Sequence, residues 1–158
     1  MKSAIISECG QYRYTLMRGN GDAGGARLCF IMLNPSTADA DEDDPTIRRC
    51  LGYMEAWGFS ELLVLNLYAY RATDPRDLFS VKDRHGPEND EYIRTLLPIC
   101  DFVVCAWGNN ALVPDQQRFI QLAKQLEIPL HYLELTKMGR PAHPLYLKSD
   151  LSPSLWEI

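Results

Sequence analysis

Four long apolar runs constrain the fold of this chain more than any other feature of its sequence. Each run is apolar along nearly its whole length, whereas a strand with one solvent-facing side alternates apolar and polar residues. Uninterrupted strands of this kind are typical of a parallel sheet that helices cover on both faces. The runs span 27–33, 61–67, 102–107 and 130–135.

The segments between these runs carry the period of amphipathic helices. Asp44 suits the N-cap of one helix and Pro45 its first position, and apolar residues then recur at helical spacing until Gly58, a stop signal. The segments 88–97 and 114–126 also place their apolar residues on one face. Strands and helices therefore alternate, and right-handed crossovers would place helices on both faces of the sheet.

The first part of the chain has a different pattern. We expect short strands at 4–7 and 12–17 around a glycine-containing turn, followed by a loop at 20–25. The prediction is a single domain over 1–158 of class α/β, a three-layer α/β/α fold with a four-stranded, mainly parallel sheet and a short N-terminal β-hairpin. Its parts are the hairpin and loop (1–26), the core (27–147) and a tail (148–158).

The charge balance limits the partners that the chain can have. The formal net charge is −5 and the sequence pI is about 5.2. Proteins that bind nucleic acid non-specifically are normally basic overall, so the composition disfavours that class. A local basic cleft around Arg71, Lys137 and Arg140 is still compatible with an acidic body.

Cysteine usage indicates a reducing compartment. The five cysteines are an odd number in no paired motif, so we expect buried free thiols in a cytoplasmic protein. No apolar run reaches the ~20 residues of a membrane span, and no signal-peptide pattern opens the chain. The acidic run at 39–44 lacks the glycine and terminal glutamate of a calcium loop. We interpret it as a solvated loop with a helix cap, and expect neither a metal nor a cofactor.

Polar side chains follow the predicted strands. Asn34 ends the first run, Asn66 lies in the second, Asn109 follows the third and His143 comes after the fourth. In open α/β sheets ligands bind beyond the carboxyl ends of the strands, where these residues would meet. An asparagine amide offers a donor and an acceptor side by side, which suits a nucleobase edge or an ordered water. A neutral histidine can donate to an oxygen that becomes negative.

Each of these residues also has a structural interpretation. Asn34 before Pro35 is good turn chemistry, and a buried Asn66 would need hydrogen-bond partners in any protein. His85 lies in a polar loop and His131 at a strand start, so we expect both to be solvated or structural.

The motifs LNPS, LLVLN, AWGNNA and HPLYL, in this order, resemble those of the uracil-DNA glycosylase superfamily. The Asn-Pro form of the first motif is similar to that of the mismatch-specific branch. The strings NPSTADA, DDPTIRRC, NLYAYRATDP and HPLYL resemble more closely a bacterial and phage family of unknown function, number 1643, that is placed beside the glycosylases. The resemblance implies a glycosylase-like fold and no cofactor.

Carried onto this sequence, the resemblance implies a catalytic pair. Asn34 would hold the hydrolytic water and His143 would stabilise the departing base anion, while Asn66 would read the base. The first motif has Asn-Pro-Ser where the strongest glycosylases have Asp-Pro-Tyr, and HPLYL lacks the phosphate-gripping serines. Tyr68, Tyr70 or Trp107 would replace the missing stacking aromatic. The expected substrate-binding residues are Pro35, Ser36, Asn66, Tyr68, Arg71, Trp107, Asn109, Arg140 and Tyr146.

The sequence thus favours recognition of a nucleobase, flipped out of any duplex, with hydrolysis of its N-glycosidic bond. Two alternatives stay open. One is a non-catalytic module that binds a nucleotide or a modified base. The other is a hydrolase of free nucleosides, which the acidic pI suits better than a DNA substrate. The sequence leaves the oligomeric state open.

Overall fold

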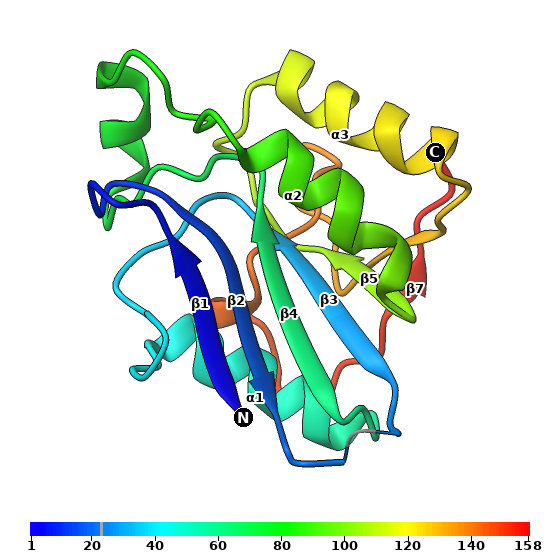
Figure 1. The fold of residues 1–158 in the computed structure, drawn as a ribbon. Helices are drawn as coiled ribbons and strands as arrows, with labels where there is room; N and C mark the ends of the chain where they lie inside the picture. Colours follow the sequence, from blue (N-terminus) through cyan, green and yellow to red (C-terminus); the bar gives the residue numbers. More distant parts are fainter. Residues whose placement is uncertain (23) are drawn as a thin grey trace.

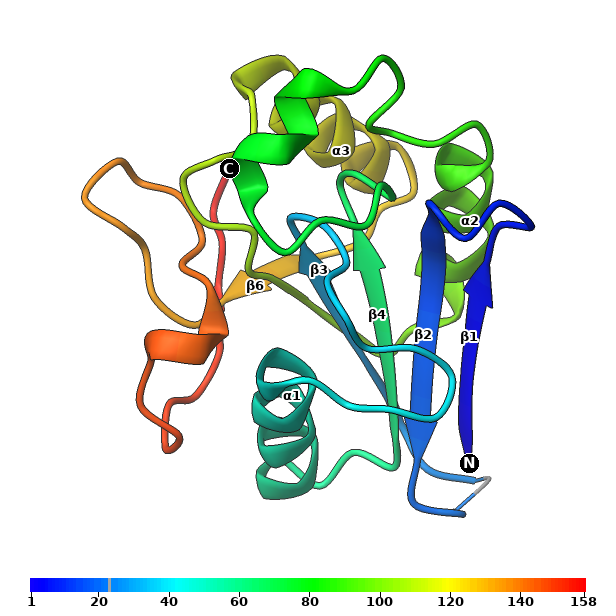
Figure 2. The same ribbon diagram turned by 90° about the vertical axis from the view of Figure 1, so that its left-hand side faces the viewer.

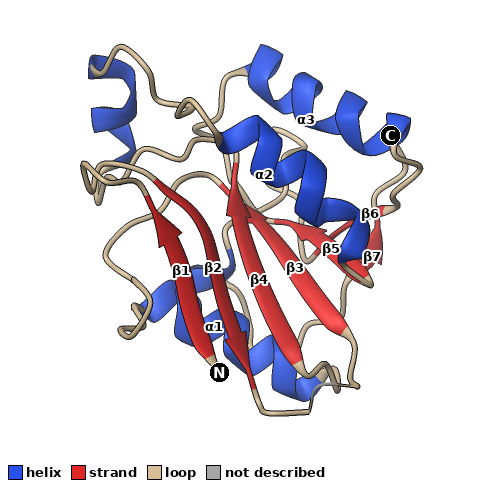
Figure 3. Cartoon of the chain, in the orientation of Figure 1, coloured by secondary structure: helices blue, strands red, loops and turns tan. Residues whose placement is uncertain are grey.

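The computed structural model describes residues 1–22 and 24–158 and contains one mixed β-sheet of seven strands (Figures 1 and 3). The strand order across the sheet is β1-β2-β4-β3-β5-β6-β7. The strands are β1 (Lys2–Ile6), β2 (Arg13–Gly19), β3 (Arg27–Met32), β4 (Glu61–Asn66), β5 (Phe102–Cys105), β6 (Leu130–Tyr132) and β7 (Ser154–Leu155).

The expectation of a four-stranded sheet is corrected by the strand pairing. Strands β4, β3, β5 and β6, which are the four apolar runs, pair in parallel at the centre. The N-terminal hairpin extends this centre, because β2 pairs antiparallel with both β1 and β4. At the other edge β7 pairs antiparallel with β6. The 148–158 segment therefore contributes a strand to the sheet.

Helices cover both faces of the sheet, as the continuous apolar runs indicate (Figures 1 and 2). Successive strand residues face opposite sides. On β3, Phe30 packs in the cluster that contains α1, and Ile31 packs in the cluster beneath α2 and α3. The helices are α1 (Pro45–Ala56), α2 (Asn89–Leu96) and α3 (Val113–Gln125), with short 3₁₀ turns η1 (Pro75–Ser80), η2 (Leu97–Ile99) and η3 (Pro144–Tyr146).

The predicted signals at the ends of α1 are confirmed. The Asp44 side chain accepts a hydrogen bond from the backbone N–H of Ile47, and Pro45 opens the helix. Gly58 follows the C-cap with φ of 79°, a left-handed conformation that glycine adopts without a steric penalty. The start of α1 is thereby fixed beside the carboxyl ends of the parallel strands.

The cysteines are free, as expected, and Cys29, Cys50 and Cys105 are buried. Within residues 1–22 and 24–158, no helix has the length and apolar character needed to cross a membrane. The same residues contain no group of three or more His, Cys, Asp or Glu side chains that could hold a metal ion.

Candidate functional site

A cavity of about 650 Å³ lies beyond the carboxyl ends of the parallel strands. Ligand pockets for small molecules have volumes of about 300–1,000 Å³, so a nucleoside-sized ligand fits this space. Its walls come from the segments after β3, β4, β5 and β6 and from the first turn of α1. Figure 2 shows the helix α1 beside the short turn η3. The polar side chains among the lining residues are those of Arg13, Asn34, Ser36, Thr37, Asp44, Thr46, Asn66, Thr73, Asn109, Asn110, Thr136, His143 and Tyr146.

Asn66, the last residue of β4, forms the most distinctive part of the cavity wall. It has the same strand parity as Leu62 and Val64, which pack in the cluster of α1, so its side chain faces the α1 side. The side chain is fully buried, and neither its Nδ2 nor its Oδ1 has a hydrogen-bond partner among the described residues. Buried amides are normally hydrogen-bonded, so this pair of free groups calls for an explanation.

His143 lies where the segment after β6 meets the end of β5. The backbone N–H of Gly108 donates to the carbonyl of Pro141 at 2.7 Å, which ties the two segments together. His143 Nδ1 accepts a hydrogen bond from the backbone N–H of Leu145 at 3.2 Å, so the neutral ring carries its proton on Nε2. Burial lowers the pKa of His143 below its ordinary value of 6.5, and the ring is therefore a neutral donor at pH 7.

Asn34 is held by the backbone around it. Its Nδ2 donates to the carbonyl oxygens of Ala72, at 2.7 Å, and of Pro35, at 3.0 Å. Because both bonds use the amide nitrogen, the amide oxygen is the group that Asn34 offers to a water or ligand in the cavity. The structure thus brings Asn34, Asn66 and His143 to one cavity, as the sequence predicts.

Four other predicted residues also line this cavity: Ser36, Trp107, Asn109 and Tyr146. The indole N–H of Trp107 donates to Gln116 and its ring packs against Phe119 beneath α3, so its stacking surface serves the core. Tyr146 is 87% exposed, with its ring centroid 6.4 Å from that of His143, and is the aromatic side chain free to cover a ligand.

The remaining predicted residues lie outside the cavity lining. Tyr68 is buried on the opposite side of the sheet, where its hydroxyl donates to Asp115 at 2.5 Å. Pro35 is buried and contributes its carbonyl to Asn34. Arg71 borders a separate open pocket with Tyr70, and its guanidinium donates to the carbonyl of Gly10 at 3.4 Å. The strand-end argument fails for Tyr68 because the chain has left the strand and turned towards α3.

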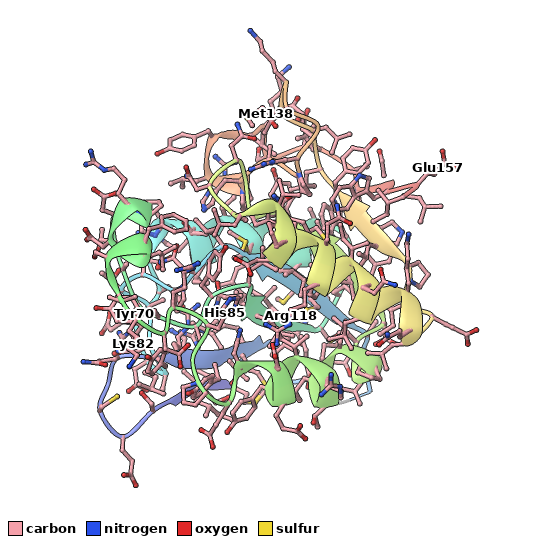
Figure 4. The ribbon with its side chains drawn as sticks, turned by 90° about the horizontal axis from the view of Figure 1, so that it is seen from above. Tyr70, Lys82, His85, Arg118, Met138 and Glu157 are labelled. Atoms are coloured by element: carbon pink, nitrogen blue, oxygen red, sulfur yellow. The ribbon has the colours of Figure 1, made fainter. Side chains whose placement is uncertain are left out.

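The expected basic rim is also corrected. Arg140 donates to the backbone carbonyls of Asn109 and Ala111, so it braces the loop after β5 instead of facing a ligand. Lys137 is absent from the described lining, and the neighbouring Met138 points away from the body of the molecule (Figure 4). The charged residues that do line the cavity are Arg13 and Asp44.

The sequence gives little signal for Arg13, which starts β2 in an alternating strand where an arginine normally faces water. In the structure it is 2% exposed, and its Nη1 donates to the carbonyl of Ala38 at 3.0 Å. Asp44 is the cavity's carboxylate, and its two oxygens accept the backbone N–H groups of Ala38 and Ile47. Asp44 is therefore engaged in holding the loop and the helix start.

The other histidines have structural environments. The ring of His131 stacks on Phe102 with centroids 3.8 Å apart, and His131 is not among the residues that line the cavity. His85 Nε2 lies 3.2 Å from Asp115, on the side of the sheet covered by α2 and α3, close to Arg118 in Figure 4. Neither contributes to the cavity.

A model of one protein family matches residues 13–145 of the chain. The chain belongs to that family, DUF1643. This family is described as a protein of unknown function. The DUF1643 match begins at Arg13 and ends at Leu145, so it includes Asn34, Asn66 and His143. No curated protein and no solved structure gave a significant match to the chain.

Proposed function

We propose that this cavity recognises a nucleobase and that the protein hydrolyses the N-glycosidic bond of the bound nucleoside unit. The observation that carries the proposal is the pair of free amide groups on Asn66, one donor and one acceptor, fully buried in the cavity wall. Base edges present donors and acceptors side by side, and an amide pairs with them in a bidentate manner. Binding such an edge would satisfy both groups of Asn66 at once.

His143 and Asn34 support the hydrolytic step. The C1′–N bond breaks with its electron pair leaving on the base, and the Nε2–H of neutral His143 donates to the base oxygen that becomes negative. A water held by the Asn34 amide oxygen attacks C1′ and loses its proton to the departing base or to solvent. The segments that carry Asn34, Asn66 and His143 follow strands of a parallel sheet centre, and this arrangement supports the resemblance to uracil-DNA glycosylases.

A non-catalytic binding module is the second candidate, and one observation favours it. Asp44, the carboxylate among the described lining residues, already accepts two backbone hydrogen bonds. A hydrolase that needs a general base for its water would lack a free carboxylate here. The binding module uses the same Asn66 amide but needs no activated water.

Product analysis separates the two candidates. The protein is incubated with oligonucleotides that contain uracil, hypoxanthine or modified pyrimidines, followed by alkali, and separately with free nucleosides, followed by chromatography of released bases. Strand scission or free base supports hydrolysis. Ligand-induced thermal stabilisation without any released base supports the binding module.

Variants at two histidines sharpen the assay. His143→Ala should lower turnover by about a hundred- to a thousand-fold, the usual cost of one donor to transition-state charge, with binding nearly unchanged. His131→Ala is the matched control, since His131 lies outside the cavity. Turnover that survives in His143→Ala would contradict the assigned role.

A further inference from the structure

Two buried arginines on β2, Arg13 and Arg18, differ in how their charges are satisfied. Both are 2% exposed. Arg18 makes five hydrogen bonds, including one at 2.8 Å from its Nε to the carboxylate of Asp43, and binds the backbone of the acidic loop through Asp39 and Glu42. The acidic loop is thus organised around Arg18.

Arg13 has no comparable set of partners. The Arg13 side chain donates one hydrogen bond, to the carbonyl of Ala38, its buried Nε has no partner, and the side chain forms no ion pair within the described residues. A guanidinium carries five N–H donors, so most of its donors are available. Burial lowers the pKa of Arg13 to about 10 while Asp44 opposes that effect, so the group is still a cation at neutral pH.

Nearby Asp44 offsets part of the charge of Arg13, but a buried cation that makes no direct ion pair still carries a desolvation penalty unless something else compensates it. Arg13 lines the same cavity as Asn66 and His143. An anionic ligand group would supply both the missing charge and the missing acceptors, and a guanidinium binds a phosphate with paired, charge-assisted hydrogen bonds.

We propose that the ligand of this cavity is a free nucleotide, whose phosphate monoester binds Arg13 while its base pairs with Asn66. The inference rests on the proposed recognition of a nucleobase and adds the substrate class. Arg13 is too deeply buried to reach the backbone of a duplex on the surface, and a cavity of about 650 Å³ accommodates a base, a sugar and one phosphate. The acidic net charge of the chain also disfavours a polymer.

Paired titrations test the inference. Uridine, thymidine, cytidine, adenosine and guanosine, and their 5′-monophosphates, are titrated by calorimetry against the wild-type chain. For the base that binds best, the monophosphate should bind about 10–100-fold more tightly than the nucleoside, the range that charge-assisted hydrogen bonds contribute. Inorganic phosphate should compete with the monophosphate and leave nucleoside binding unchanged.

Three variants assign the preference to Arg13. Arg13→Gln should bring the two affinities within about threefold of each other by weakening binding of the monophosphate, as the lost charge acts on the phosphate. Arg13→Lys, which keeps the charge but loses the planar fork, should retain part of the preference and serves if the glutamine variant fails to fold by circular dichroism. Arg76→Gln, at an arginine paired with Asp74 on the surface, is the control that should retain the full preference.

The outcomes are decisive in both directions. Equal affinities for the nucleoside and the monophosphate, a preference that persists in Arg13→Gln, or no binding of either ligand would overturn the inference. An Arg13-dependent preference without release of a base would leave the phosphate site standing and refute the hydrolysis. Release of bases from nucleosides without any phosphate preference would support the hydrolysis and refute the phosphate site.

Discussion

Replacement of Asn66 by leucine should make the unliganded protein more stable. Both polar atoms of this side chain are buried without a partner, and leucine has a similar size but no group that needs one. An unsatisfied buried group costs about 1–3 kcal/mol, and the side chain carries two of them. We expect Asn66→Leu to raise the free energy of unfolding by about 2 kcal/mol, after allowance for imperfect packing of the branched methyl groups.

The assay is urea unfolding followed by circular dichroism. The midpoint should rise while the slope with denaturant is unchanged, since the surface exposed on unfolding is nearly the same. A gain of 2 kcal/mol corresponds to a thermal midpoint higher by about 4–8 °C for a chain of this size. The same variant should lose binding of any nucleoside or nucleotide, which places the amide in recognition and not in folding.

Asn89 provides a matched control. It is also a buried asparagine beside the same strand end, and its Oδ1 likewise has no partner among the described residues, but its Nδ2 donates to the carbonyls of Asn66, at 2.9 Å, and Leu67, at 3.4 Å. Asn89→Leu removes these hydrogen bonds together with one unpaired oxygen, so the two effects oppose each other and the variant should not raise the free energy of unfolding as Asn66→Leu does. If Asn66→Leu is neutral or destabilising as well, the Asn66 amide is satisfied in the unliganded protein and the argument for a vacant recognition group is refuted.

Three further predictions concern ionisation and exposure. Burial lowers the pKa of His143, so as the pH falls the unfolded chain takes up a proton at this residue before the folded protein does. The free energy of unfolding should therefore decline below about pH 6.5, and His143→Gln should reduce that decline in thermal unfolding at pH 5–8. A hydrogen bond with Ser7 lowers the pKa of the exposed Cys9 thiol, so Cys9 should react first with Ellman's reagent. Burial raises the pKa of Cys50, which should react only on unfolding. A fast phase that persists in Cys9→Ser would contradict this assignment. Tyr146→Ala should leave the thermal midpoint unchanged but weaken ligand binding by about 1–3 kcal/mol in calorimetry, and unchanged affinity would show that this ring does not cover the ligand.

Local patterns in the sequence predict much of this fold. The apolar runs identify the four parallel strands because their residues pack on both faces of the sheet. The Asp44-Pro45 pair identifies the start of α1 because capping depends on neighbouring residues alone. The last run is the exception: β6 ends at Tyr132, and Leu135 instead forms a bridge to Pro141.

The site is predicted only where strand position decides it. Asn34, Asn66 and His143 follow from the rule that parallel strands end at one edge. Arg13 does not, because its partners are distant in the sequence: its side chain donates to the carbonyl of Ala38 and its backbone N–H to that of Ala69, and no local pattern fixes these contacts. Tyr68 and Arg140 fail for the same reason: tertiary partners, here Asp115 and backbone carbonyls, decide where their side chains point.

The pairing of β2 with β4 also has a consequence for shortened versions of the chain. Without the hairpin, β4 would become an outer strand, with a row of unpaired backbone N–H and carbonyl groups along Glu61–Asn66. Natural edge strands avoid pairing with one another through charged residues and prolines. β4 has a charge only at its first residue and contains no proline. A fragment that begins at residue 27 would therefore be prone to self-association through intermolecular strand pairing. In the full chain the hairpin covers this edge and protects the central sheet from aggregation.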